Sequence, residues 1–339
     1  MKQRLFLIFF LVLTLTLAVS TYAAEPVRLI FDTDLGNDID DSMALAVIHA
    51  LQNRGECEVL AITTTKDNPW VAPMINVLNT FYGRPDIPIA VVKNGATKED
   101  GSYNRQVLEL RDDSGKLRYP RTLMPEDSAN LPDAVPFLRQ LLAGEPDGSV
   151  VFVQVGFFTN FARLLDTPAD TLSPLTGKEL IAKKVKLLSL MAGSFNSSGH
   201  KEYNIVNDIP SAKKLITQWP TAMIFSGYEI GESISHPGVS MKEDYSYVKY
   251  HPLKDAYKFY RNGFNDTATF DLTSVFYAVR PNRGYFDLSP PGTVTVSDDG
   301  QTTFTPGAGG KHRYMIVRPE QVPMVREAFV QLCSEPPKH

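Results

Sequence analysis

The sequence predicts an α/β fold, with a mainly parallel central sheet, helices on both of its faces, and a small β-rich C-terminal extension. Two observations predict it. Short β-branched runs recur along the chain and are apolar at nearly every position, as in strands buried on both faces. Segments with apolar residues at helical spacing separate these runs, and this alternation is typical of parallel sheets.

The elements are expected in the following order. The strands are expected at residues 27–31, 59–63, 87–92, 150–155, 185–190 and 222–225. The helices between them are expected at residues 41–52, 71–82, 134–142, 158–165 and 211–218. The polar stretch at residues 94–130 predicts a long loop or small insertion near the mouth of the sheet. The β-rich extension is expected at about residues 282–318, followed by a closing helix at residues 319–333.

The N-terminus has the three-part pattern of a secretory signal peptide. Two basic residues precede an uncharged apolar run at residues 5–19, and small residues precede a cut after Ala23 or, alternatively, after Ala24. The apolar run is short for a membrane span of about 20 residues. We therefore expect a signal peptide at residues 1–23, one domain at residues 24–339, and a secreted or periplasmic protein without a membrane anchor after cleavage.

Composition excludes some classes of function. The net charge is -4, so no basic footprint for nucleic acid is present. Cys57 and Cys333 are the only cysteines, which excludes a disulfide framework and a cysteine metal cluster. Whether these two cysteines pair is left open by the sequence.

An acidic loop follows the first expected strand. The segment Asp32-Thr33-Asp34-Leu35-Gly36-Asn37-Asp38-Ile39-Asp40-Asp41 holds five carboxylates in ten residues. Crowded like charges repel strongly in a partly dry site, and a hard divalent cation with oxygen ligands would offset that repulsion. Alternatively, the loop is solvated, and Asp40 or Asp41 caps the next helix. The two interpretations are compatible.

Other polar segments also follow expected strands. Residues 65–68 come after the second strand, residues 156–160 after the fourth, and residues 191–204 after the fifth. In open α/β sheets, ligands bind at the carboxyl ends of the strands. We therefore expect these segments to meet the acidic loop at one edge of the sheet.

The acidic loop resembles the signature of the inosine-uridine nucleoside hydrolase family, Asp-x-Asp-x-Gly-x-Asp-Asp. Asp32, Asp34 and Gly36 match in register, and the pair Asp40-Asp41 matches the closing pair if two extra residues are allowed before it. The insertion leaves Asp38 as the alternative to Asp40 for the sugar-binding role, and the adjacent pair favours Asp40. The resemblance implies a Rossmann-like, nucleoside hydrolase-like fold.

The resemblance continues in order along the chain. Residues 156–160 resemble the family's Gly-Pro-Leu-Thr-Asn, residues 191–193 its Met-Gly-Gly, and residues 202–204 its Glu-Phe-Asn, while residues 270–271 stand where the family often has His-Asp. These matches imply a calcium ion (Ca2+) held by Asp34, Asp41, Asp271 and the carbonyl of Thr159. They imply ribose-binding side chains at Asp40, Asn68, Asn196, Glu202 and Asn204.

The activity that the resemblance implies is calcium-dependent hydrolysis of the N-glycosidic bond of a ribonucleoside or related N-ribosyl compound. Free base and ribose would be the products, and Asp34 would accept the proton of the attacking water. The expected partner is a small-molecule nucleoside or N-riboside. Family members are often dimers or tetramers, so the resemblance also allows a homo-oligomer.

The most important departure from the family lies at residue 270. Phe270 replaces the histidine that commonly protonates the leaving base, and phenylalanine cannot donate a proton. Another acid could serve instead, such as His200 or a tyrosine, or the leaving group could need no proton. A third interpretation is a secreted ribose- or nucleoside-binding protein that retains the calcium site with little or no turnover. A phosphoaspartyl hydrolase fits less well, because its downstream lysine and acidic pair are missing from strand ends.

Overall fold

The structure, a computed structural model, describes residues 25–196 and 198–338. The signal peptide expected at residues 1–23 lies outside the described residues. Within the described part, none of the helices has both the length and the apolar character that crossing a membrane requires.

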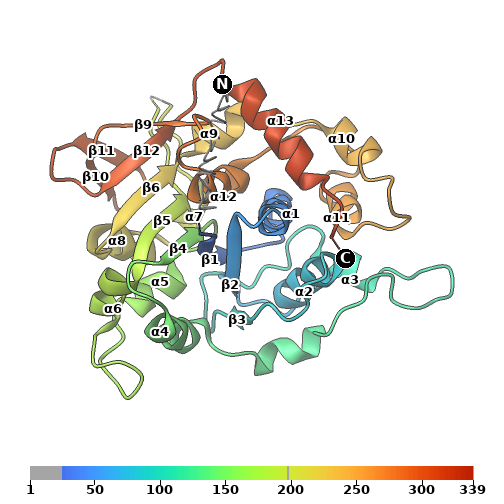
Figure 1. The fold of residues 1–339 in the computed structure, drawn as a ribbon, viewed down its shortest axis with the longest axis horizontal. Helices are drawn as coiled ribbons and strands as arrows, with labels where there is room; N and C mark the ends of the chain where they lie inside the picture. The colour runs from blue at the N-terminus through green and yellow to red at the C-terminus, as the bar shows by residue number, and fades with distance from the viewer. Residues whose placement is uncertain (1–24, 197, 339) are drawn as a thin grey trace, which may run out of the picture.

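Ten strands of the described chain form one central sheet (Figure 1). The strand order is β11-β10-β12-β6-β5-β4-β1-β2-β3, with β9 paired to β12. Every pair from β12 to β3 is parallel. The parallel strands are β1 (Val27–Thr33), β2 (Cys57–Thr64), β3 (Ile89–Val91), β4 (Val150–Gln154), β5 (Val185–Met191), β6 (Ala222–Ser226) and β12 (His312–Ile316). The predicted fold class, a mainly parallel sheet with helices on both faces, is confirmed.

The burial of β1 on both faces explains why its sequence is apolar at successive positions. Leu29, Ile30 and Phe31 of β1 are all completely buried. Leu29 and Phe31 belong to one hydrophobic core and Ile30 to a second core on the opposite face. Because successive side chains of a strand point to opposite faces, a strand covered on both sides needs an apolar residue at each position.

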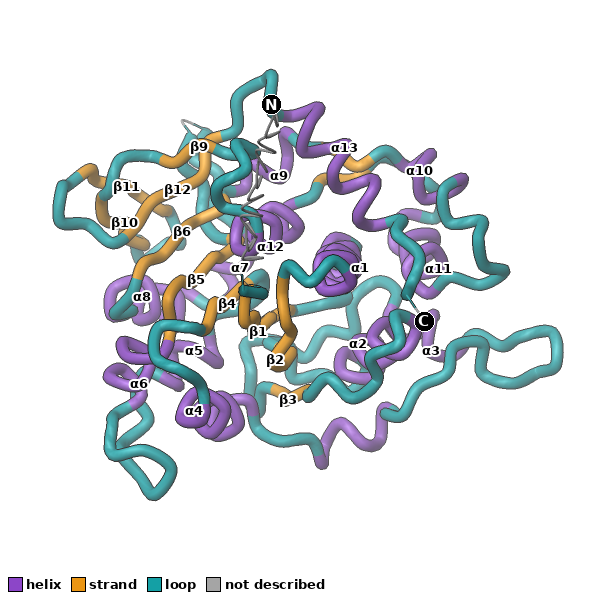
Figure 2. The backbone as a smooth tube through the Cα atoms, viewed as in Figure 1, coloured by secondary structure: helices purple, strands orange, loops and turns teal. Residues whose placement is uncertain are grey.

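Helices cover both faces of the sheet, as Figure 2 shows in purple around the orange strands. The first core contains residues of α1 (Asp40–Asn53), α2 (Val71–Phe81), α11 (Pro252–Arg261), α12 (Phe270–Val279) and α13 (Val322–Cys333). The second core contains residues of α4 (Ala134–Gly144), α5 (Thr159–Leu164), α6 (Gly177–Lys184) and α8 (Ile209–Gln218).

The polar stretch at residues 94–130 contains more regular structure than the sequence indicated. It includes α3 (Asn104–Glu109), the 3-10 helix η1 (Pro125–Asn130), and an isolated bridge between Arg111 and Leu117. The remaining short elements are α7 (Tyr203–Asn207), α9 (Tyr228–Ser233), α10 (Gly238–Glu243), β7 (Ser235–His236) and β8 (Thr267–Ala268). These pieces are too short to give a clear periodicity, which explains why the sequence pattern did not reveal them.

The C-terminal extension contains antiparallel strands and a closing helix, as expected. The antiparallel strands are β9 (Asp287–Leu288), β10 (Gly292–Val296) and β11 (Thr302–Pro306). Thr302 exchanges hydrogen bonds with the backbone of Ser194: its Oγ1 donates to the carbonyl at 2.9 Å and accepts from the N–H at 3.0 Å. The extension therefore supports the loop that follows β5.

Cys57 and Cys333 are free thiols in the structure, and both are buried. Both lie against α1, because Cys57 Sγ contacts the carbonyl oxygen of Ile48 at 3.6 Å and Cys333 Sγ that of Met43 at 3.8 Å. The sequence left open whether the two cysteines pair. In the structure they are two separate thiols.

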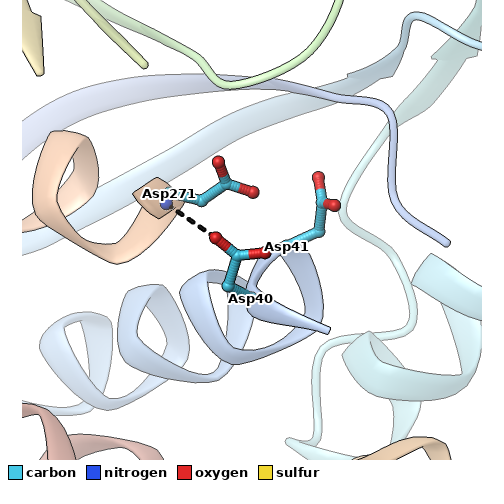
Figure 3. A group of neighbouring side chains, drawn as sticks. All are labelled: Asp40, Asp41 and Asp271. Atoms are coloured by element: carbon cyan, nitrogen blue, oxygen red, sulfur yellow. Dashed lines mark hydrogen bonds between the residues drawn. The ribbon is translucent and has the colours of Figure 1, made fainter. Parts of the chain in front are cut away.

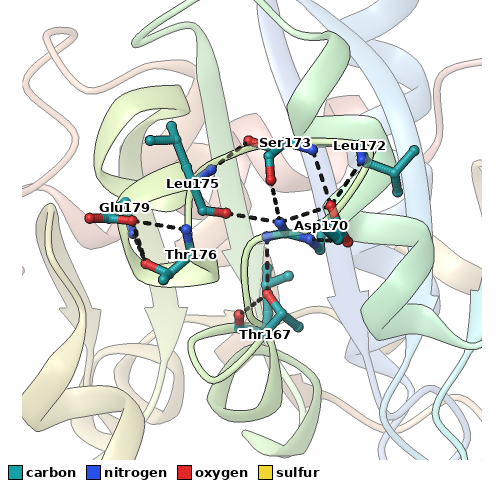
Figure 4. Close-up of polar contacts among 9 residues, drawn as sticks. Thr167, Asp170, Leu172, Ser173, Leu175, Thr176 and Glu179 are labelled. Carbon is teal, nitrogen blue, oxygen red and sulfur yellow. Dashed lines mark hydrogen bonds and ion pairs between the residues drawn. The ribbon is translucent and has the colours of Figure 1, made fainter.

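The loop between α5 and α6 is fixed by one buried cation (Figure 4). Arg139 of α4 donates to both carboxylate oxygens of Asp170, at 2.7 and 3.0 Å, and to the carbonyl oxygens of Ser173 and Leu175. Only 3% of the arginine is exposed, so these charge-assisted bonds compensate its burial. The bonds therefore hold this loop against α4.

Candidate functional site

The acidic loop joins β1 to α1, and hydrogen bonds from the segment at residues 101–104 hold it in place. The N–H of Ser102 donates to the carbonyl of Gly36 at 2.7 Å, and Asn104 Nδ2 donates to that of Leu35 at 2.9 Å. Gly36 has a φ of 124°, and a Cβ on it would lie 2.3 Å from Asn104 Nδ2. Only glycine therefore fits this turn.

Three buried carboxylates meet where α1 and α12 begin (Figure 3). Asp40, Asp41 and Asp271 each offer one oxygen, and these oxygens lie within 4.8 Å of one another. Asp40 and Asp41 open α1, and Asp271 lies in the first turn of α12. The backbone N–H of Asp271 donates to Asp40 Oδ2 at 3.0 Å, which joins the two helix ends.

The electrostatics of this group are unfavourable without a cation. Burial, followed by repulsion from neighbouring carboxylates, raises the pKa of Asp40 to about 8. The same causes raise the pKa of Asp41 and of Asp271 well above the ordinary value. A site with only oxygen donors and excess negative charge matches the ligand preference of a hard divalent cation. The donor set therefore fits calcium.

Asp34 lies beside this group on the wall of the same cavity. It is 4% exposed, its Oδ2 accepts a hydrogen bond from Asn37 Nδ2 at 2.6 Å, and burial raises its pKa to about 6. Asp32 lies deeper, where Asn160 Nδ2 donates to it at 2.8 Å, and burial raises its pKa to about 7. The five carboxylates thus divide into a buried set of four and one exposed residue, Asp38.

Asp40 and Asp38, the two alternatives for the sugar-binding role, lie in different surroundings. Asp40 is 2% exposed and belongs to the three-carboxylate group. Asp38 is exposed, and Tyr260 Oη of α11 donates to its Oδ1 at 2.8 Å. The two extra residues in the loop therefore place Asp38 at the cavity rim.

The cavity has a volume of about 560 Å³, a size suited to a small-molecule ligand, and its carboxylates include those of Asp34, Asp40, Asp41 and Asp271. Its lining also includes Glu202 and Asn204. Glu202 caps α7 and accepts hydrogen bonds from the N–H groups of Asn204 at 2.6 Å and Ile205 at 3.1 Å; burial raises its pKa to about 7. Asn204 Nδ2 donates to the carbonyl of Val155 at 3.0 Å.

An aromatic stack forms another part of the cavity lining. The rings of His200 and Tyr228 stack with centroids 3.7 Å apart, and Tyr228 stacks on Phe270 at 5.2 Å. All three residues line the cavity. The sequence singled out His200 and Phe270 but gave no sign of Tyr228, because the stack joins three separate segments of the chain.

Three of the predicted site residues are not among the described residues that line this cavity. The Oγ1 of Thr159 donates to Asp208 at 2.8 Å. Asn68 Nδ2 donates to the carbonyl of Lys98 and to Asp100, so it fastens a neighbouring loop. Asn196 accepts from Ser198 and lines a second cavity instead.

The strand end of β4 nevertheless reaches the cavity through another residue. Val155, four positions before Thr159, follows β4 directly and lines the cavity. The motif lies at a strand end that reaches the cavity, but the chain turns at Gly156 and Thr159 lies in α5. A Cβ on Gly156 would lie 2.6 Å from the backbone nitrogen of Asp34, so the motif packs tightly against the acidic loop.

Comparison with solved structures gives the same fold. A plant nucleoside hydrolase, the PpNRh1 enzyme, matches with 22% identity, a TM-score of 0.61, and coverage of 91% of this chain and 98% of that one. The purine-preferring ribonucleoside hydrolase from Gardnerella vaginalis matches with 18% identity, a TM-score of 0.66, and the same coverage. The type III effector protein XopQ, complexed with adenosine diphosphate ribose, matches with 15% identity, a TM-score of 0.62, and coverage of 92% and 96%.

A protein-family model matches most of the chain. No curated protein matches it. The model of the inosine-uridine preferring nucleoside hydrolases matches residues 29–327, which include the acidic loop and Asp271. With the fold and the buried carboxylates in agreement, the chain belongs to the inosine-uridine preferring nucleoside hydrolase family.

Proposed function

We propose that this protein uses calcium to hydrolyse the N-glycosidic bond of a ribonucleoside or a related N-ribosyl compound, giving free base and ribose. One observation carries the proposal: the buried group Asp40, Asp41 and Asp271 lines a cavity large enough for a small-molecule ligand, in a chain of this family. Such a concentration of buried, like-charged carboxylates is costly to fold and is typical of a functional site.

Asp34, Asp41 and Asp271 would hold the ion, together with Asp40, whose oxygen lies in the same group. Calcium bound there would supply positive charge that orients the sugar and makes a neighbouring water more acidic. Because Val155 lines the cavity at the end of β4 and Thr159 does not, the carbonyl of Val155 is proposed as the backbone ligand in place of that of Thr159.

Asp34 is proposed as the general base. Its carboxylate lies on the cavity wall, and Asn37 fixes its orientation by a 2.6 Å hydrogen bond. Burial raises its pKa to about 6, which suits a group that must accept a proton near neutral pH.

The sugar-binding side chains are proposed to be Asp40, Glu202 and Asn204, all of which line the cavity. A ribose hydroxyl removed from such a site would leave a buried polar group unpaired, so a deoxyribose should be strongly disfavoured. Asn68 and Asn196 remain predictions from the family resemblance, and their positions in the structure add no support.

For the leaving group we propose His200 as the proton donor. Phe270 occupies the family's usual histidine position, and the stack of Phe270, Tyr228 and His200 brings an imidazole to the same cavity. Histidine is the side chain whose ordinary pKa suits proton transfer near neutral pH. His200→Ala should lower kcat most for nucleosides with poor leaving groups, and an unchanged kcat for every substrate would contradict this role.

A ligand-binding protein with little turnover is the second candidate. Phe270 favours it, because the usual proton donor is absent from its position. The effector relative solved with adenosine diphosphate ribose shows that a protein of this fold can hold an N-ribosyl compound larger than a nucleoside.

The deciding experiment is an incubation of the purified mature chain with purine and pyrimidine nucleosides and other N-ribosyl compounds, including adenosine diphosphate ribose. Free base and ribose are followed with calcium and with a chelator. Calcium-dependent release of both products supports the hydrolase. Saturable binding without release, in protein that binds calcium, would instead support the binding protein.

We further propose that the protein is secreted or periplasmic after removal of residues 1–23, and that residues 24–339 act as one domain. Mass spectrometry of the protein from the secreted or periplasmic fraction tests both the cut after Ala23 and the location. Size-exclusion chromatography with light scattering tests whether it is a homo-oligomer.

A further inference from the structure

Lys66 is completely buried, although lysine is rarely found so. It follows β2, and it is not among the described residues that line the cavity, whereas Asn37 is. Its Nζ donates to Asn37 Oδ1 at 2.7 Å. Because burial of an ammonium group is costly unless opposite charge compensates it, the charge of Lys66 needs partners behind the acidic loop.

The partners are carboxylates of the candidate site. Asn37 links them directly, since its Oδ1 accepts from Lys66 Nζ and its Nδ2 donates to Asp34 Oδ2 at 2.6 Å. Burial lowers the pKa of Lys66, and four carboxylates oppose that effect, in descending order Asp34, Asp41, Glu99 and Asp100. The interaction is mutual, because the positive charge of Lys66 lowers the pKa of Asp34 against the effect of burial.

The position of Lys66 separates it from the substrate. The ammonium lies behind Asn37, which itself lines the cavity, so a ligand in the cavity meets the amide and not the lysine. The lysine therefore acts on the site through its charge and through Asn37.

We propose that Lys66 is an internal counterion of the acidic loop that stabilises the carboxylates in the metal-free protein and thereby lowers the affinity of the site for calcium. The inference rests on the proposed calcium site but not on turnover. The physical basis is electrostatic. The fixed positive charge of Lys66 attracts the carboxylates when no metal is bound, and it repels a divalent cation that binds to them.

The proposal predicts that loss of the Lys66 charge lowers the stability of the metal-free protein and raises its affinity for calcium. Removal of the charge should weaken the metal-free fold, because Asp34 loses a positive charge that opposes the effect of its burial. The same change should strengthen calcium binding, on the order of tenfold for a unit charge acting on a divalent ion across a partly buried site. A residue with only a packing role would not produce this pair of effects.

The test compares wild type, Lys66→Met and a control, Lys98→Met, as full mature chains. Lys98 is also near the site loops, but its side chain is 77% exposed and lies 3.9 Å from Asp67. Calcium binding is measured by isothermal titration calorimetry, and thermal unfolding is measured in chelator and in saturating calcium. Lys66→Met should bind calcium about tenfold more tightly, and its Tm should fall more in chelator than in calcium. Lys98→Met should resemble wild type in both measurements.

The inference is overturned if Lys66→Met binds calcium as tightly as wild type or more weakly. It is also overturned if the substitution lowers the Tm by the same amount in chelator and in saturating calcium. If Lys66→Met does not fold, Lys66→Gln replaces it, since glutamine can still donate to Asn37 while removing the charge; the same outcomes apply. Absence of calcium binding by wild type would defeat the proposed function and this inference together. Normal binding by wild type with an unchanged Lys66→Met would defeat only this inference.

Discussion

The carboxylate of Asp40 accepts a hydrogen bond from the backbone N–H of Asp271 at 3.0 Å, although the two residues are 231 positions apart. This bond fixes the first turn of α12 against the first turn of α1. It also brings the carboxylate of Asp271 to those of Asp40 and Asp41, so the same contact that joins the helices assembles the candidate metal site.

Replacement of Asp40 should therefore affect the site far more than replacement of Asp38. Asp40→Ala removes one oxygen of the buried group and the acceptor for Asp271, whereas Asp38→Ala removes only an exposed carboxylate that contacts Tyr260. We expect Asp40→Ala to lower kcat/KM by about 100-fold or more and Asp38→Ala by less than about fivefold. Steady-state kinetics on a substrate found in the panel incubation provides the comparison, and the reverse ranking would assign the sugar-binding role to Asp38.

Asp34→Asn should preserve the fold and remove activity. Asparagine has nearly the same shape and can still bond to Asn37, but it cannot accept the proton of the attacking water. The expected loss in kcat is about 100-fold or more, the range typical of a general base. Circular dichroism and thermal unfolding serve as the control for folding. Turnover equal to wild type would show that Asp34 is not the base.

Asp271→Ala should weaken calcium binding by at least about tenfold, a loss seen even for residues that only support a metal ligand. Calorimetric titration of calcium into the chelated protein measures it. Asp244→Ala is a suitable control, because that residue ends α10 and is not part of the buried group. A calcium titration unaltered by Asp271→Ala would remove this residue from the ligand set.

The metal-free protein should lose stability as the pH rises from about 6 to about 8. Burial raises the pKa of Asp32 and Glu202 to about 7 and that of Asp40 to about 8. Carboxyl groups with raised pKa values stabilise the fold fully at pH values below their unfolded pKa, and that stability is lost as the pH rises through the folded values.

Calcium should reverse this trend, because it replaces protons as the partner of the same carboxylates. The gain in Tm on adding calcium should therefore be larger at pH 8 than at pH 6. Thermal unfolding at both pH values, with chelator and with calcium, measures the difference. A calcium effect independent of pH would show that the ion does not compete with protons at these groups.

The two cysteines should remain reduced in the folded protein. Burial raises the pKa of Cys57 to about 12 and raises that of Cys333 as well, so neither thiol is reactive in the folded state. A thiol reagent should label neither cysteine in the native protein and both after denaturation without reductant. Failure to label either cysteine after denaturation would indicate a disulfide.

The sequence by itself determined the sheet and the location of the site. Strands such as β1 are buried on both faces, and that condition imposes an apolar residue at each position, which is visible without coordinates. The acidic loop was equally visible, because crowded carboxylates have few structural purposes. The carboxyl-end rule for parallel strands then placed the loop beside Glu202 and Asn204, and the structure brings these residues to one cavity.

Only the tertiary structure decided which side chains reach the cavity. Asn68 and Asn196 match the family by spacing, but Asn68 bonds to the loop at residues 98–100 and Asn196 lines a second cavity. Local spacing fixes a residue's place along the chain, whereas its side-chain direction depends on neighbours that are distant in sequence.

The same reason applies to the groups that the sequence did not reveal. Tyr228 stacks between His200 and Phe270, and Lys66 reaches Asp34 through Asn37, in each case across separate elements of the fold. Stacking and charge compensation act through space and leave no periodic pattern along the chain. The sequence therefore determined where the site forms, and the packing of distant segments decided how its charges are balanced.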